Sequence, residues 1–175
     1  GREGAGRGGR GVVGAPKAVG SGESGTVRTL SGAGRVVIAA GGGGIPVTSE
    51  GNHLRGAKAV IDKDFASSLM GRGLGADYLI ILTAVEKVAI NFGKPEQRWL
   101  DTLTPEEARK YIAEGHFAPG SMLPKVEAAV AFAESKPGRK ALITLLEKAH
   151  EGGEGETGTV IKTSVNDFPV GIADC

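Results

Sequence analysis

A chain of 175 residues is long enough for one domain with a buried core. Its nearly balanced charge, +1 at pH 7, gives no electrostatic reason to expect nucleic acid or an anionic membrane as a partner. No segment approaches the roughly eighteen uninterrupted apolar residues of a membrane span. The only cysteine is Cys175, which excludes an intramolecular disulfide or a cysteine-based metal site within this sequence. With no signal segment recognisable at its start, the sequence predicts a cytoplasmic protein.

The first 34 residues are rich in glycine and poor in helix formers. Residues 1–11, GREGAGRGGRG, have no hydrophobic period, which predicts a flexible basic segment. Glycines interrupt residues 20–34 so often that we expect only a turn of helix, at 26–30. Because the sequence begins at Gly1 rather than Met, we expect a fragment or a processed product.

The segment from Val36 to Asp64 is the most informative part of the chain. Residues 36–40, VVIAA, form a β-branched apolar run that predicts a buried strand, and glycines 41–44 follow at once. Glycines after a strand can bring bare backbone N–H groups close to an anion, although a tight strand-to-loop transition would explain them equally well. The segment ends in Asp62-Lys63-Asp64, between apolar neighbours. We interpret Lys63 and the glycines as facing one phosphate; the alternative is an ordinary solvated helix start.

Helices and strands alternate after this segment. A helix is expected over 62–70, a buried strand over 77–83 and a second strand over 88–92. Thr104-Pro105-Glu106-Glu107 has the pattern of a capping box and predicts a helix that ends near Glu114. Further elements are predicted in chain order: a helix over 126–134, a strand over 140–144, helical turns over 145–150 and a strand over 159–162. This alternation indicates an α/β fold with a mainly parallel sheet covered on both faces.

Two other segments could bind an anion. Gly120-Ser121-Met122 precedes a predicted helix that carries Lys125, and a helix N-terminus with a nearby lysine suits a phosphate. Pro16-Lys17 supplies a third lysine. An exposed loop is the alternative for each. The three histidines (His53, His116 and His150) lack metal-ligand spacing and are interpreted as structural, and Trp99 is interpreted as a packing residue.

Four long motifs resemble the C-terminal portion of carbamate kinases, which belong to the amino-acid-kinase superfamily: VVIAAGGGGIPV, GNHLRGAKAVIDKDFAS, LGADYLIILTAVEKVAINFGKPEQ and EGHFAPGSMLPKVEAAVAF. The likeness covers roughly residues 35–161. GRGGRGVVGAPKAV resembles the family's arginine-rich segment and Pro-Ser-Pro-Lys element, with Gly11 and Gly14 in place of an arginine and a proline.

The resemblance implies a three-layer αβα sandwich that is incomplete at the N-terminus, because the family's first half, with its Gly-Gly-Asn loop, has no counterpart here. It divides the chain into a Gly/Arg-rich remnant of the acceptor region (1–34), a nucleotide-binding domain (35–163) and an unassigned tail (164–175). The implied activity is the reversible transfer of a phosphoryl group between ATP and carbamate, by a cytoplasmic homodimer that makes ATP from carbamoyl phosphate in arginine breakdown, the arginine deiminase pathway.

The resemblance also implies a role for each matching residue. Lys17, Lys63 and Lys125 would surround the phosphoryl group, with Asp64 orienting the lysines. Gly42, Gly43 and Gly44 would bind substrate oxygens. The implied nucleotide-binding residues are Thr83, Ala84, Val85, Asn91, Phe92, Gly120, Ser121 and Met122. Mg²⁺ would accompany ATP or ADP, held mostly by phosphates and water rather than by protein side chains.

Two alternatives to an active carbamate kinase stay open. The first is a catalytically incompetent fragment that only binds nucleotide, which the absent Gly-Gly-Asn half favours. The second is another amino-acid kinase that acts on a carboxylate or a nucleotide, which the spacing of VIDKD and GSMLPK disfavours.

Overall fold

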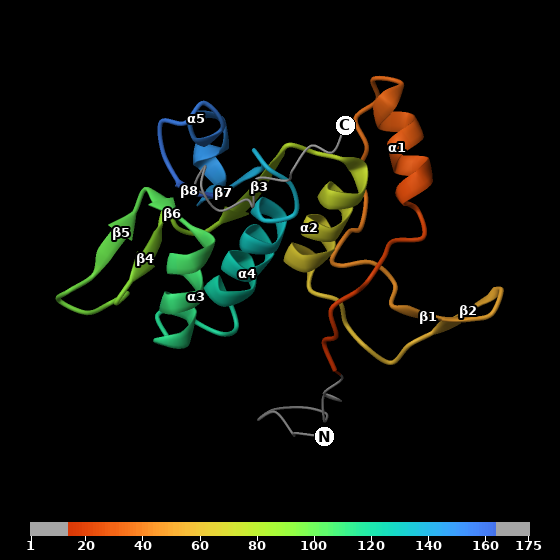
Figure 1. Ribbon diagram of the computed structural model, residues 1–175, viewed down its shortest axis with the longest axis horizontal. Coiled ribbons are helices and arrows are strands. Elements are labelled where there is room, and N and C mark those ends of the chain that lie inside the picture. The colour runs from red at the N-terminus through yellow and green to blue at the C-terminus, as the bar shows by residue number, and fades with distance from the viewer. Residues whose placement is uncertain (1–13, 164–175) are drawn as a thin grey trace, which may run out of the picture.

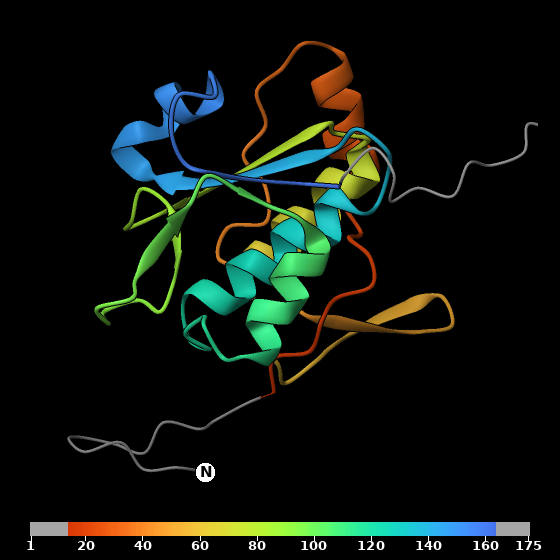
Figure 2. The ribbon, with the colours of Figure 1, turned by 60° about the vertical axis from the view of Figure 1, so that its left-hand side comes forward.

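The computed structural model describes residues 14–163, which form a four-stranded sheet with helices on both sides and two separate hairpins (Figures 1 and 2). The elements are, in chain order, α1 (Ser24–Gly32), β1 (Val47–Glu50), β2 (His53–Gly56), α2 (Lys63–Leu74), β3 (Tyr78–Thr83), β4 (Val88–Ile90), β5 (Arg98–Leu100), β6 (Thr102–Leu103), α3 (Pro105–Ala113), α4 (Met122–Ala133), β7 (Lys140–Leu145), a 3₁₀ turn (Leu146–Lys148), α5 (Ala149–Gly153) and β8 (Thr159–Lys162). No helix among them is long and apolar enough to cross a membrane.

The sheet has the strand order β3-β7-β8-β6 and is mixed. β3 pairs with β7 and β6 pairs with β8 in parallel, whereas β7 and β8 are antiparallel. The predicted α/β class is therefore confirmed. Two of the three strand pairings are parallel, as expected for a mainly parallel sheet. β1 with β2 and β4 with β5 form antiparallel hairpins outside this sheet.

The core lies between one face of the sheet and helices α2, α3 and α4, which Figure 2 shows on the same side. Ile81, Ile143 and Ile161 point to this face from three neighbouring strands, because alternate residues of a strand share a face. α4 is apolar on nearly every side and has no solvent-facing stripe, so it is buried along most of its length; Val126 and Phe132 are completely buried.

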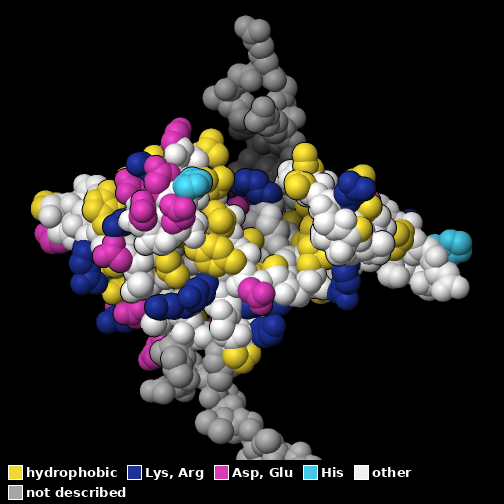
Figure 3. Space-filling model, turned by 90° about the horizontal axis from the view of Figure 1, so that it is seen from above, with side chains coloured by type: hydrophobic (Ala, Val, Ile, Leu, Met, Phe, Trp, Pro, Cys, Tyr) yellow, Lys and Arg dark blue, Asp and Glu magenta, His cyan; other side chains and the backbone are white. Residues whose placement is uncertain are grey.

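The opposite face of the sheet is covered only over β7. α5 and the loop that follows it lie there, and a Cβ added to Gly152 would be 2.9 Å from Leu142. On β3, at the edge, Tyr78, Ile80 and Leu82 are 37–42% exposed. Hydrophobic side chains accordingly appear at the surface between α5 and α1 when the molecule is seen from above (Figure 3).

The predicted starts of α2 and α3 are confirmed, whereas α2 continues to Leu74 rather than ending at 70, and α4 begins at Met122 rather than at 126. The Asp62 carboxylate accepts a hydrogen bond from the backbone N–H of Asp64 at 2.8 Å and starts α2. Thr104 and Glu107 make both bonds of the capping box at the start of α3. The last strand, β8, has the predicted bounds 159–162.

The predicted buried strand over 36–40 is wrong. These residues have no regular structure, and Val36 and Ile38 are 97% exposed. An apolar run becomes a buried strand only where neighbouring strands pair with its backbone and cover its side chains, and no strand among residues 14–163 does so. The hairpins β1–β2 and β4–β5 were not predicted, and α1 is longer than the expected turn. The flexible segment 1–11 and the tail 164–175 lie outside the described residues.

The capping box gives the first testable prediction. Replacing Thr104 by alanine removes the acceptor for the N–H of Glu107, and we expect the free energy of unfolding to fall by about 1 kcal/mol. Urea denaturation followed by circular dichroism measures the change. Ser31→Ala, on the exposed surface of α1, is the control and should leave stability unchanged within about 0.5 kcal/mol. Equal stability of the two variants would contradict the capping role.

Candidate functional site

A buried ion pair joins α2 to α4 and is the centre of the candidate site. The Lys125 ammonium lies 2.9 Å from Oδ2 of Asp64, and both residues are at most 9% exposed. Lys63 lies 3.7 Å from the same oxygen, but its side chain is 59% exposed. Asp64 therefore lies within ion-pair distance of two lysines: one buried and one facing solvent.

The local sequence explains why a carboxylate can be buried here. Asp64 lies in the first turn of α2, where the helix dipole favours negative charge. The remaining cost of burying it is offset by the ammonium of Lys125, because buried charges are tolerated only when they are paired. The predicted proximity of Lys63, Asp64 and Lys125 is thus what the structure shows.

Lys17 approaches the same two helices from a different segment. Gly14 forms a parallel bridge with Ala59 and accepts a hydrogen bond from the N–H of Val60 at 3.1 Å, which places the start of the described chain beside the approach to α2. The Lys17 ammonium lies 4.5 Å from the ring centroid of Phe65 on α2 and 3.8 Å from Glu127 on α4. It is 64% exposed and hence open to a ligand.

The glycine loop packs closely against the segment that leads into α2. Gly43 has φ +139°, and a Cβ at this position would lie 2.0 Å from the carbonyl oxygen of Ile61. Its N–H donates to the carbonyl of Ala40 at 2.8 Å, so this amide is used within the turn. At Gly43 the glycine is required by the close approach of two backbones. Gly42 and Gly44 have open space around them, and their role toward an anion stays a prediction.

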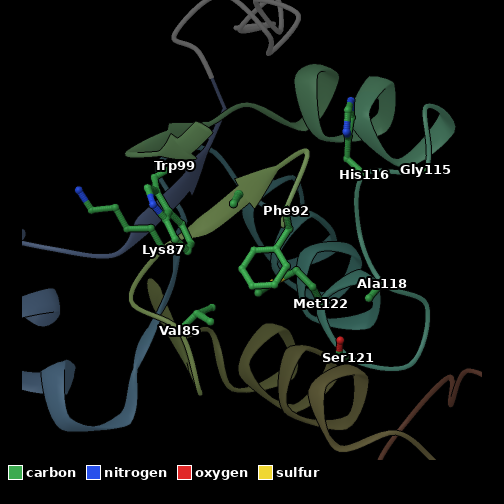
Figure 4. A pocket seen from close by; sticks show the side chains of 10 residues that line it. Val85, Lys87, Phe92, Trp99, Gly115, His116, Ala118, Ser121 and Met122 are labelled. Carbon is green, nitrogen blue, oxygen red and sulfur yellow. The ribbon is translucent and has the colours of Figure 1, made fainter. Parts of the chain in front are cut away.

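A cavity of about 360 Å³ opens beside the start of α4 (Figure 4). It is lined by Val85, Lys87, Ala89, Phe92, Trp99, Gly115, His116, Ala118, Ser121 and Met122. Four of these, Val85, Phe92, Ser121 and Met122, are predicted nucleotide-binding residues, and Figure 4 shows Phe92 and Met122 side by side. The other four predicted residues do not line the cavity: Thr83, Ala84, Asn91 and Gly120. Each of them is one or two positions away in the sequence from a residue that does.

The cavity and the lysine cluster share one helix end. Ser121 is the N-cap residue of α4 and lines the cavity, and Lys125 lies one turn further along the same helix. A molecule bound in the cavity would therefore extend toward the lysines along the N-terminus of α4, where backbone N–H groups and the helix dipole favour an anion.

Sequence reasoning missed part of the cavity wall. Trp99 contacts Phe92 edge to face, with ring centroids 6.1 Å apart, and contributes to the cavity rather than only to packing. Its position follows from the β4–β5 hairpin, in which Trp99 is opposite Ala89. The hydrogen bond from Lys87 to Asp101, 2.5 Å long, raises the pKa of Lys87 above its ordinary value, so this lining residue is a cation at neutral pH.

Comparison with known proteins identifies the family. The model of the amino acid kinase family matches residues 5–144. The chain belongs to this family. It is 64% identical to the carbamate kinase-like protein YqeA of Escherichia coli over 160 residues and 51% identical to the carbamate kinase of Clostridium perfringens; both matches cover 91% of this chain. The resemblance to carbamate kinases is therefore confirmed.

Solved structures agree with this assignment. Carbamate kinase from Giardia lamblia bound to AMP-PNP superposes with a TM-score of 0.88 at 42% identity, covering 93% of this chain and 51% of that one. The chain spans about half the length of the curated relatives it matches, 52% of the E. coli protein and 51% of the C. perfringens enzyme.

The close approach at Gly43 predicts a sharp difference between neighbouring glycines. Gly43→Ala should lower the free energy of unfolding by about 2 kcal/mol, because a Cβ would meet the Ile61 carbonyl and the backbone angle suits only glycine. Gly42→Ala, with open space and no positive φ, is the matched control. Thermal or urea unfolding of both variants measures the difference, and a Gly43→Ala chain as stable as the control would rule out the packing role.

The buried pair predicts unequal roles for its two lysines. Lys125→Met leaves the Asp64 carboxylate buried beside a single distant ammonium and should cost about 3 kcal/mol of stability. Lys63→Met removes an exposed charge and should change stability by less than about 0.5 kcal/mol. Urea denaturation at neutral pH compares the two. The double variant Asp64→Leu/Lys125→Met should recover part of the loss; if it is less stable than Lys125→Met, the explanation by an unpaired buried charge is wrong.

Proposed function

We propose that this chain is the nucleotide-binding part of a carbamate kinase and carries three lysines of its phosphoryl-transfer site. The reaction is carbamoyl phosphate plus ADP to ATP plus carbamate, which decomposes to CO₂ and NH₃, and it runs in both directions. The observation that carries the proposal is the cavity at the N-cap of α4, one helical turn from the buried Asp64–Lys125 pair. The names of the relatives and the AMP-PNP in the Giardia structure support it.

In this proposal the cavity holds the base and ribose, and the phosphates extend toward the lysines. The apolar wall made by Phe92, Trp99 and Met122 suits the face of a base, because aromatic side chains stack on it. Val85, Ser121 and the adjoining residues Thr83, Ala84, Asn91 and Gly120 shape the rest of the site.

The lysines supply electrostatic stabilisation in the proposed mechanism. Carbamate is already an anion, so no general base is needed to create the nucleophile, and catalysis consists of holding two anions in line while charge spreads over the phosphoryl group. Lys17 and Lys63 are exposed cations that can contact this group, and Lys125 is fixed by Asp64. Asp64 acts by orienting ammonium groups and does not transfer a proton.

Mg²⁺ enters this proposal as part of the nucleotide substrate. Residues 14–163 contain no group of three or more His, Cys, Asp or Glu side chains that could hold a metal ion, and the Asp64 carboxylate is occupied by two lysines. We expect the ion to be bound mostly by phosphate oxygens and water, as the resemblance to carbamate kinases implies.

Assembly and location follow the family in this proposal. We expect a homodimer in the cytoplasm that acts at the end of arginine breakdown, as the resemblance to carbamate kinases implies. A second candidate function is nucleotide binding without turnover, for which the cavity beside α4 would suffice. Another amino-acid kinase, acting on a carboxylate or a nucleotide, is the third and is disfavoured by the carbamate kinase motifs.

The deciding experiment measures ADP binding and ATP formation in the same preparation. We expect the chain to bind ADP in isothermal titration calorimetry, and to form ATP from ADP, carbamoyl phosphate and Mg²⁺. Lys63→Ala should lower the rate of ATP formation by roughly 10²–10³-fold, the loss expected for a donor that acts on the transition state. Lys110→Ala, an exposed lysine on α3, is the control.

The possible results separate the candidate functions. Binding without ATP formation would establish the second candidate and exclude an active kinase for this chain. A folded chain without ADP binding would overturn the proposal itself.

A further inference from the structure

His116 connects the loop after α3 to the turn that forms one wall of the cavity. Its Nδ1 accepts a hydrogen bond from the backbone N–H of Asn91 at 3.3 Å, and its Nε2 lies 3.0 Å from Oε2 of Glu114. The ring meets Tyr111 edge to face, with centroids 5.5 Å apart, and the side chain is only 17% exposed. Arg98 donates a hydrogen bond to the Tyr111 hydroxyl at 3.2 Å and is the positively charged residue next to the His116–Tyr111 pair.

These contacts define one state of the imidazole. Because Nδ1 accepts from an N–H group, it carries no proton, so in the neutral ring the hydrogen is on Nε2 and is donated to Glu114. Both nitrogens are then satisfied, and the contact with Tyr111 fixes the plane of the ring. Such an arrangement holds a histidine in one orientation with little freedom to rotate.

The residue whose amide donates to His116 has a left-handed backbone conformation. Asn91 has φ +53°, a region that asparagine adopts more readily than most residues other than glycine. It directly precedes Phe92, whose side chain is part of the cavity wall and is 63% exposed. A side chain so exposed is held mainly by its own backbone and by the edge contact with Trp99. The backbone of Asn91 therefore decides where the Phe92 ring lies.

The rest of the turn does not replace this contact. The N–H of Lys94 donates to the carbonyl of Asn91, and the N–H of Gly93 donates to the side chain of Gln97, which closes the turn on itself. Among the hydrogen bonds of this turn, the one to His116 ties it to the α3–α4 connection, the element that carries Ala118 and Ser121 on the facing wall (Figure 4).

We propose that His116 is a positioning residue of the nucleotide pocket. As the Nε2–H tautomer it holds the amide of Asn91, keeps Phe92 beside Met122, and so sets the affinity for the base of ADP. The inference rests on the proposed nucleotide function of the cavity and assigns a role to a histidine that the sequence suggested was merely structural.

Two substitutions separate this role from simple packing. His116→Asn keeps an acceptor oxygen near the position of Nδ1, whereas His116→Phe keeps the edge contact with Tyr111 but has no acceptor. We expect His116→Phe to raise the dissociation constant of ADP about fivefold, the size expected for one hydrogen bond, and His116→Asn to stay within about twofold of the parent chain. His150→Asn, on the exposed end of α5 where His150 lies 3.6 Å from Glu154, is the matched control and should not change affinity.

A measurement without nucleotide tests the same inference independently. In the ¹⁵N-histidine spectrum of the whole 175-residue chain, His116 should show a protonated Nε2 and an unprotonated Nδ1. Hydrogen exchange of the Asn91 amide should be slow in the parent chain and faster in His116→Phe. If the chain binds no ADP, the proposed function fails, whereas these two signals still decide whether His116 holds the turn.

Three results would overturn the inference. They are a proton on Nδ1, unchanged exchange of the Asn91 amide in His116→Phe, or equal loss of ADP affinity in the Asn and Phe variants.

Discussion

The buried contact between Asp64 and Lys125 is the interaction on which the candidate site depends. It joins the first turns of α2 and α4, two helices that begin at residues 63 and 122 and meet only through the tertiary fold. A charge pair away from water is stable only in good geometry, so the contact constrains how the two helix ends approach each other. The position of Lys63 relative to α4 follows from it.

The same contact explains how the anion site that we propose can be stable without a ligand. Lys63 and Lys125 would repel each other, but both lie beside the Asp64 carboxylate, at 3.7 Å and 2.9 Å, and Glu127 lies 3.8 Å from Lys17. The exposed ammonium groups are then held in place before a ligand arrives. For the phosphoryl transfer that we propose, this preorganisation is the protein's main contribution, because little reorganisation is left for the reaction itself.

Features encoded by neighbouring residues could be predicted from the sequence, and features that need a distant partner could not. Asp62 and the Thr104–Glu107 box define helix starts within four residues, and both were predicted. The run 36–40 has the composition of a buried strand, yet its burial depends on other segments, and in the structure it is exposed. The three lysines and four of the ten cavity-lining residues were named by resemblance. Trp99 was missed because its role depends on the β4–β5 register.

The two halves of the candidate site therefore differ in what assembles them. The cavity is built from residues 85–122, a continuous stretch in which a hairpin and the α3–α4 connection fold back on each other. The lysine cluster needs residues 17, 63 and 125, which only the packing of α2 on α4 and the bridge at Gly14 bring together. Local contacts cost less chain entropy to form than distant ones. The nucleotide binding that we propose would consequently place a smaller demand on the fold than the proposed phosphoryl transfer, so that one could persist without the other.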